Sequence, residues 1–217
     1  DRRCGYVPQK YSLFPDKTVL GNVTFGLEVS ESRSFWLLRS IHRQKSREFR
    51  AAAMRSLEQT GLHESAAHKY PHQLSGGMQQ RVAIAQALIL KPPILLMDEA
   101  FSALDPLTRS GMQQLIKELW RQSGTTIVFV THNTREAVCL GTRVVALAGN
   151  GVEGSSVALD LDTKHLEFDS DEEEIQSVIE RVECAPQPGL VGLQEDALQK
   201  KSGGRGFLAA DYADCAD

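Results

Sequence analysis

The chain lacks the phosphate-binding loop motif G-x-x-x-x-G-K-[ST] throughout its 217 residues. Such a loop cradles nucleotide phosphates with backbone N–H groups and a lysine, so these residues alone do not supply that grip on a triphosphate. Long hydrophobic runs are absent as well, because no stretch reaches the roughly 18 consecutive apolar residues that a membrane-spanning helix needs. Both absences direct attention to a globular core and to other motifs.

Charge and cysteine content argue against two further classes. The net charge is −4, whereas proteins that bind nucleic acid through a general electrostatic surface are usually basic. The four cysteines are Cys4, Cys139, Cys184 and Cys215, and no two of them form a C-x-x-C pair. We therefore expect free thiols rather than a zinc site or a disulfide framework.

Strands and helices are expected to alternate along most of the chain. Ser75 and Asp105 are suited to cap the start of helices, and Gly124 is suited to end one. Short apolar runs such as 94–97 predict strands buried on both faces of a sheet. This alternation is typical of a parallel α/β sheet. The predicted strands are 3–9, 94–97, 125–131 and 143–147, and the predicted helices are 16–29, 34–60, 76–90, 106–123 and 134–140.

The predicted helix 34–60 and the residues just before it carry many cations and few acids. Its basic residues are Arg33, Arg39, Arg43, Lys45, Arg47, Arg50 and Arg55. Two interpretations remain open, a solvated helix face or a basic surface near a membrane or a partner subunit.

Two motifs carry the chemistry of the sequence. The first is the string Leu74-Ser75-Gly76-Gly77-Met78-Gln79-Gln80-Arg81, a Ser-Gly-Gly turn that opens a helix. Backbone N–H groups at a helix start, together with the helix dipole, favour phosphate oxygens. The second is the apolar run 94–97 followed by Asp98 and Glu99. Carboxylates at the carboxyl end of a buried strand suit a Mg²⁺ ligand and a base for water.

In this order, the two motifs resemble the signature and Walker B motifs of ATP-binding cassette (ABC) ATPases. The resemblance covers roughly residues 3–150 and adds three further motifs. It implies an α/β fold of the P-loop NTPase-like ABC type with a helical subdomain, here missing the N-terminal strands and the phosphate loop. The implied units are 1–15 (Q-loop segment), 16–73 (helical subdomain), 74–150 (signature helix to switch histidine), 151–185 (C-terminal extension) and 186–217 (flexible tail).

The resemblance also implies a role for each motif. Glu99 would be the catalytic carboxylate and His132 the switch histidine, while Asp98 and the Q-loop Gln9 would hold Mg²⁺, partly through water. The signature residues would contact ATP held by a partner subunit, and the D-loop would cross the dimer interface. The signature residues are Leu74, Ser75, Gly76, Gly77 and Gln79, and the D-loop residues are Ser102, Ala103, Leu104 and Asp105.

We therefore expect an ATP-binding and ATP-hydrolysing subunit of a bacterial importer, seen as an incomplete sequence, with ATP and Mg²⁺ as cofactors. It would lie at the cytoplasmic face of the plasma membrane with a second ATPase subunit, membrane permease subunits and, indirectly, a solute-binding protein. A short, non-hydrolysing partner that supplies its signature motif in trans is the alternative. A DNA-maintenance ATPase is disfavoured, because the segment between Gln9 and Leu74 leaves no room for coiled-coil arms.

The solute stays open, because two likenesses point in different directions. Residues 70–73 and 131–138 resemble the nitrate, sulfonate and taurine group, whereas 97–106 is also similar to the quaternary-amine group. Three positions depart from the family pattern, namely Gln86 for arginine, Ala100 for proline and Asn133 for aspartate. None of these departures replaces a residue with an essential catalytic role in the family.

Overall fold

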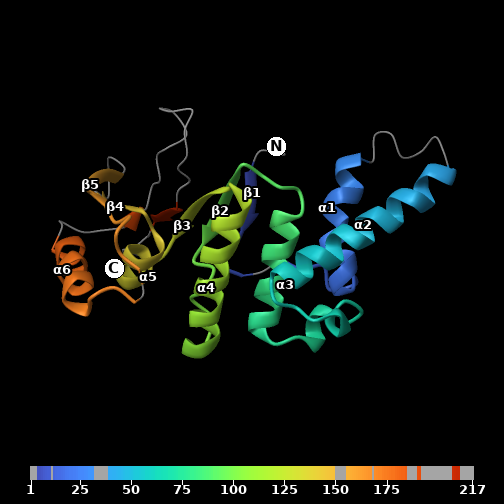
Figure 1. Cartoon of the computed structure of the whole chain (residues 1–217), viewed down its shortest axis with the longest axis horizontal. Helices are drawn as coiled ribbons and strands as arrows, with labels where there is room; N and C mark the ends of the chain where they lie inside the picture. The colour runs from blue at the N-terminus through green and yellow to red at the C-terminus, as the bar shows by residue number, and fades with distance from the viewer. Residues whose placement is uncertain are drawn as a thin grey trace.

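One mixed sheet flanked by helices forms the described part of the chain. The computed structural model describes residues 4–10, 12–31, 39–149, 155–167, 169–184, 190–191 and 207–210. The strands are β1 (Cys4–Val7), β2 (Ile94–Asp98), β3 (Thr126–Val130), β4 (Arg143–Gly149), β5 (Ser155–Asp162), β6 (Leu190–Val191) and β7 (Phe207–Ala210). The helices are α1 (Val19–Glu31), α2 (Arg39–Gln59), α3 (Gly76–Leu88), α4 (Pro106–Ser123), α5 (Thr134–Leu140) and α6 (Glu172–Glu183), with 3₁₀ turns at Glu64–Ala66 and Pro71–Gln73. Figure 1 places α1 and α2 at one end of an elongated molecule and α6 at the other.

The sheet brings the ends of three parallel strands to one edge. Its order is β1-β2-β3-β7-β6-β4-β5, and β1, β2, β3 and β7 run parallel. Met97 of β2 is in register with Val7 and with Phe129, and Asp98 is in register with Val130. The predicted α/β architecture is therefore confirmed, but the sheet is mixed, because β5 and β6 run antiparallel to β4. The residues that follow β1, β2 and β3 emerge side by side.

The predicted caps are confirmed and explain where the helices begin and end. The Ser75 hydroxyl accepts from the Met78 N–H at 3.3 Å, and the Asp105 carboxylate accepts from the Thr108 N–H at 3.1 Å. Each cap satisfies an N–H that has no partner within its own helix. Gly124 has a φ of 70°, a left-handed conformation that ends α4 and suits glycine.

Strand β2 differs from the prediction of a strand buried on both faces. Leu95 and Met97 are fully buried, but Ile94 is 41% exposed and Leu96 is half-buried. Successive side chains of a strand point to opposite faces, so one face of β2 is covered and the other is not. The covered face packs in one hydrophobic cluster with Met112 and other apolar residues of α4.

Two groups of buried apolar residues hold the molecule together. The larger group joins the strands to α4, α5 and α6 and contains a ring contact between Phe101 and Phe129 at 5.0 Å between centroids. The smaller group joins α1, α2 and α3 through residues such as Val19, Leu57 and Val82. Helix α3 contributes to both groups, so it connects the helical end to the sheet. The unit boundaries given above stay a prediction.

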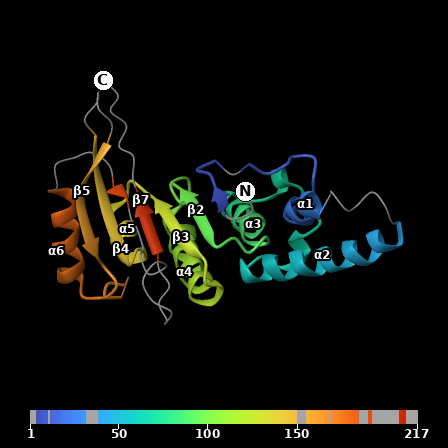
Figure 2. The same ribbon diagram turned by 90° about the horizontal axis from the view of Figure 1, so that it is seen from above.

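The region after β4 holds elements that the sequence patterns did not predict. Helix α6 is capped by Asp171, which accepts from the Glu173 N–H, and it buries Ile175 and Ile179. Strands β6 and β7 fall inside the span expected to be a tail, and β7 lies between β3 and β4 (Figure 2). In the part of the chain that the structure describes, no helix is long and apolar enough to cross a membrane.

Candidate functional site

Four of the predicted site residues meet at the carboxyl edge of β1, β2 and β3. Gln9 follows β1 by two residues, His132 follows β3 by two, and Asp98 ends β2 with Glu99 next in the chain. The Gln9 side-chain amide donates to one carboxylate oxygen of Glu99. His132 Nδ1 lies 3.5 Å from the other oxygen, Glu99 Oε1. The carboxylate of Glu99 is therefore held between two polar side chains from the flanking strands.

Glu99 also has an unusual backbone. Its φ is 40°, in the left-handed region that costs a residue with a Cβ about 1–3 kcal/mol. Its N–H donates to the Val130 carbonyl at 2.9 Å, and its carbonyl accepts from the Ser102 N–H at 3.1 Å and the Ser102 hydroxyl at 2.9 Å. These three bonds fix the backbone of Glu99 on both sides of its α-carbon. Strained residues held in this way are concentrated at functional sites.

Tyr6 is a member of this edge that the sequence analysis missed. Its hydroxyl donates to Asp98 Oδ2 at 3.1 Å. Tyr6 is 56% exposed, and local desolvation of its hydroxyl raises the pKa of the phenol. The hydrogen bond to Asp98 and the negative charge of Asp98 raise this pKa further. Tyr6 is in register with Leu96, two residues before Asp98, and the sequence alone does not give this register.

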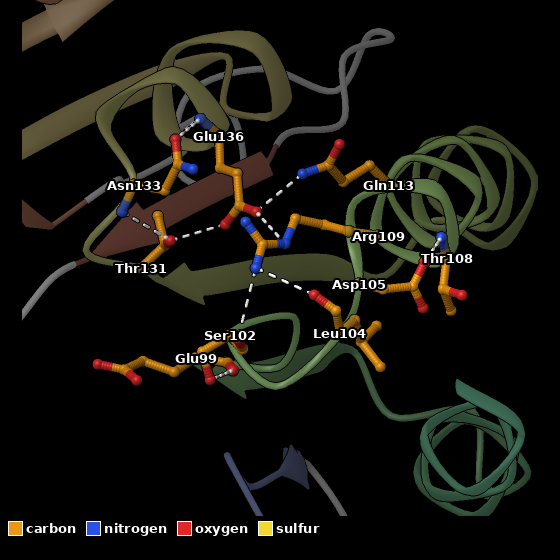
Figure 3. Close-up of polar contacts among 10 residues, drawn as sticks. All are labelled: Glu99, Ser102, Leu104, Asp105, Thr108, Arg109, Gln113, Thr131, Asn133 and Glu136. Atoms are coloured by element: carbon orange, nitrogen blue, oxygen red, sulfur yellow. Dashed lines mark hydrogen bonds and ion pairs between the residues drawn. The ribbon is translucent and has the colours of Figure 1, made fainter. Parts of the chain in front are cut away.

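The D-loop residues form a tight turn between Glu99 and α4. The Leu104 N–H donates to the Phe101 carbonyl at 3.1 Å. The Arg109 guanidinium, from the first turn of α4, donates to the carbonyls of Ser102 at 3.4 Å and Leu104 at 3.2 Å. Figure 3 shows Arg109 reaching over this turn toward Glu136. Arg109 of α4 therefore holds this turn in place, and the sequence patterns did not single out this arginine.

The signature residues lie apart from the Glu99 cluster. Within the described residues, no hydrogen bond or ion pair joins Ser75, Gly76 or Gly77 to Asp98, Glu99 or His132. Gly77 is buried against Thr108 of α4. The side chain of Gln79 donates back to the Leu74 carbonyl at 3.3 Å, which closes the turn. The structure therefore groups the predicted residues into two sets rather than one.

The donor set at Asp98 fits a sparsely ligated cation. Within the described residues, no three His, Cys, Asp or Glu side chains are grouped to hold a metal ion. Mg²⁺ is usually held by one or two carboxylates with substrate phosphates and waters, so it needs no such group. Asp98 Oδ2 is engaged by Tyr6, while Asp98 Oδ1 has no partner among the described residues. One carboxylate oxygen is therefore open at the edge where Gln9 also lies.

Comparison with known proteins finds relatives of this chain among ATP-binding proteins of transporters. Residues 1–102 match the family described as ABC transporter. The chain is 44% identical over 151 residues to the glycine betaine transport ATP-binding protein OpuAA of Bacillus subtilis, covering 70% of this chain and 33% of that protein. It is 44% identical over 144 residues to the taurine import ATP-binding protein TauB of Rhizobium johnstonii, covering 66% of this chain and 50% of that protein.

A solved structure agrees with these matches. The post-hydrolysis dimer of the ATP-binding cassette MJ0796 bound to ADP and Pi matches with a TM-score of 0.58 and 36% identity, covering 74% of this chain and 63% of that one. The chain belongs to the family of ABC transporter ATP-binding proteins. It spans between 33% and 50% of the length of the two curated relatives named above.

Proposed function

We propose that the chain is part of the ATP-binding and ATP-hydrolysing subunit of an ABC importer. The observation that carries this proposal is the Glu99 carboxylate at the end of β2, held between Gln9 and His132. A carboxylate fixed at a sheet edge can orient a water molecule and accept its proton. The relatives named for glycine betaine and taurine uptake support an importer, and they leave the solute open.

Each residue at the edge then has a task. Glu99 is the general base for the attacking water, and His132 contacts the terminal phosphate of ATP. Asp98 and Gln9 would hold Mg²⁺, partly through water, and the ion would neutralise charge on the phosphates. Tyr6 donates to one oxygen of Asp98, and the other oxygen would be available to the ion.

The signature residues serve a second subunit in this proposal. The N–H groups of Gly76 and Gly77 donate to no acceptor within the described residues, as expected at a helix start. Because these residues lie apart from Glu99, they would complete the ATP site of a partner in a head-to-tail dimer. The similar MJ0796 cassette is dimeric in its post-hydrolysis state, which supports such a pairing. Permease subunits in the membrane, and through them a solute-binding protein, complete the assembly at the cytoplasmic face.

A second candidate is a short partner that lends Ser75–Gly77 without hydrolysing ATP itself. It is favoured by the N–H groups of Gly76 and Gly77, which donate to no acceptor within the described residues. The two candidates differ in where activity appears. The first predicts hydrolysis only in a complete subunit that contains a phosphate loop. The second predicts that the 217-residue chain stimulates a separate full-length subunit and needs Ser75 to do so.

The deciding experiment measures steady-state ATP hydrolysis by the complete subunit. Glu99→Gln removes the base with little change in size, and we expect the rate to fall by about 10²–10⁴-fold while ATP binding is retained. Glu118→Gln is the matched control, because Glu118 is an exposed glutamate of α4. Hydrolysis at the parent rate by Glu99→Gln would remove the proposed role of this residue.

A further inference from the structure

The buried carboxylate of Glu136 lies between the turn at residues 102–104 and the turn that carries His132. The side chain of Glu136, on α5, is only 7% exposed. Its Oε2 accepts from the Thr131 hydroxyl at 2.7 Å, and its Oε1 accepts from the Gln113 amide at 2.9 Å. Arg109 Nε lies 3.7 Å from Oε1, too far for a hydrogen bond but close enough for an ion pair. A buried charge needs such partners, and Glu136 has them on two sides.

These partners come from two different segments of the site. Thr131 directly precedes His132 and also accepts the N–H of Asn133 at 3.1 Å, so it is built into the turn that carries the switch histidine. Arg109 belongs to α4 and donates to the carbonyls of Ser102 and Leu104 at 3.4 and 3.2 Å. Figure 3 shows the Arg109 and Glu136 side chains meeting between the two turns.

The contacts close into a ring around Glu99. On one side, Ser102 holds the backbone of Glu99, and Arg109 holds Ser102. On the other side, Glu136 holds Thr131, whose neighbour His132 faces the Glu99 carboxylate at 3.5 Å. The Arg109–Glu136 ion pair is the link that joins these two sides.

We propose that Arg109 and Glu136 are positioning residues, which hold the 102–104 turn and the His132 turn in one fixed relation so that Glu99 is correctly oriented. The inference rests on the proposed function, because it concerns the same hydrolysis step. Neither residue needs to touch the nucleotide. Their loss should therefore lower the rate of the chemical step while leaving the affinity for ATP nearly unchanged.

Arg109→Lys in the complete subunit is the sharpest test. Lysine keeps the positive charge beside Glu136 but lacks the planar fork that reaches two carbonyl oxygens and the carboxylate together. We expect kcat to fall by about 10–100-fold, as for a reacting group displaced by about 1 Å, with KM for ATP changed by less than about twofold. Arg121→Gln is the control, since Arg121 lies on the same helix and pairs with Glu167 at 2.8 Å on an exposed surface. Its kcat should match the parent.

Glu136→Gln and the double variant complete the test. Glutamine keeps an acceptor for Thr131 but removes the charge that faces Arg109. If both residues act through one link, the double variant should be no slower than the slower single variant. Should Glu136→Gln fail to give folded protein, Arg109→Lys decides alone. A parent-like kcat for Arg109→Lys, a loss confined to KM, or losses that multiply in the double variant would each overturn the inference.

The Glu99→Gln variant separates this inference from the proposed function. If Glu99→Gln hydrolyses ATP at the parent rate, the proposed function fails first. If Glu99→Gln is inactive while Arg109→Lys is fully active, the proposed function stands and only the positioning role fails.

Discussion

Replacing Gly77 with alanine tests how closely α3 approaches α4. A Cβ built at Gly77 would lie 2.4 Å from Thr108 Cγ2. Carbon atoms in favourable contact are about 3.5–4.0 Å apart, so the helix or the threonine must move by about 1 Å. Overpacking costs about 1–3 kcal/mol, whereas glycine to alanine in a helix gains up to about 1 kcal/mol. We expect Gly77→Ala to lower the free energy of unfolding by about 1 kcal/mol.

Thr108→Ser provides the matched background for this substitution. Serine lacks Cγ2 but keeps the hydroxyl, and it keeps the backbone N–H that Asp105 accepts at 3.1 Å. In this background, Gly77→Ala should be neutral or stabilising by up to about 1 kcal/mol, because only the helix preference for alanine remains. The two sites should therefore show a coupling energy of about 1–3 kcal/mol.

The assay is urea unfolding of the parent, the two single variants and the double variant as complete subunits without nucleotide. Leaving out ATP separates helix packing from any contact of Gly77 with a phosphate. The reasoning is refuted if Gly77→Ala changes the free energy of unfolding equally in the parent and in the Thr108→Ser background. It is also refuted if the alanine stabilises the protein in the presence of Thr108.

Two further outcomes follow from ionisable groups outside the site. Arg143 lowers the pKa of the Asp160 carboxyl through a hydrogen bond and its charge, so this pair stabilises the fold above the ordinary pKa and loses that effect as pH falls. Asp160→Asn should therefore lower the free energy of unfolding by less than about 1 kcal/mol at about pH 7, because the pair is partly exposed. It should have no effect once the pH is below the lowered pKa, and urea unfolding at several pH values would show both results. Burial raises the pKa of the Cys139 thiol, whereas Cys4 is exposed. An alkylating reagent should label Cys4 in the native protein but Cys139 only after unfolding, and equal labelling rates would contradict the buried placement.

Local signals in the sequence were sufficient for the elements that carry the site. Ser75 and Asp105 cap helices by satisfying nearby N–H groups, and such bonds depend on residues close in the chain. The short apolar run before Asp98 and Glu99 likewise predicted a strand that ends at the carboxyl edge. In the structure, the parallel pairing of β1, β2 and β3 places Gln9 and His132 at this same edge. The roles given to these residues stay predictions.

Contacts between distant segments were beyond sequence patterns. Tyr6 meets Asp98 across neighbouring strands, and Arg109 meets Glu136 between α4 and α5. Nothing in the spacing of these residues distinguishes them from surface tyrosine, arginine or glutamate. The half-open face of β2 was missed for a similar reason, because an apolar run predicts a strand but not whether helices cover both its faces. The sequence around β7 is rich in glycine and polar residues, which are typical of loops, so the four-residue strand was not predicted.

Glu99 depends both on local sequence signals and on contacts between distant segments. Its position at the end of β2 is a matter of chain order, but its positive φ depends on bonds from Val130 and Ser102, which oppose the strain. A strained backbone persists only where its surroundings over-determine it. Because Ser102 is in turn held by Arg109, weakening that arginine should loosen the backbone of Glu99 before it unfolds any element. The arrangement therefore makes the orientation of one carboxylate sensitive to a side chain that does not touch it.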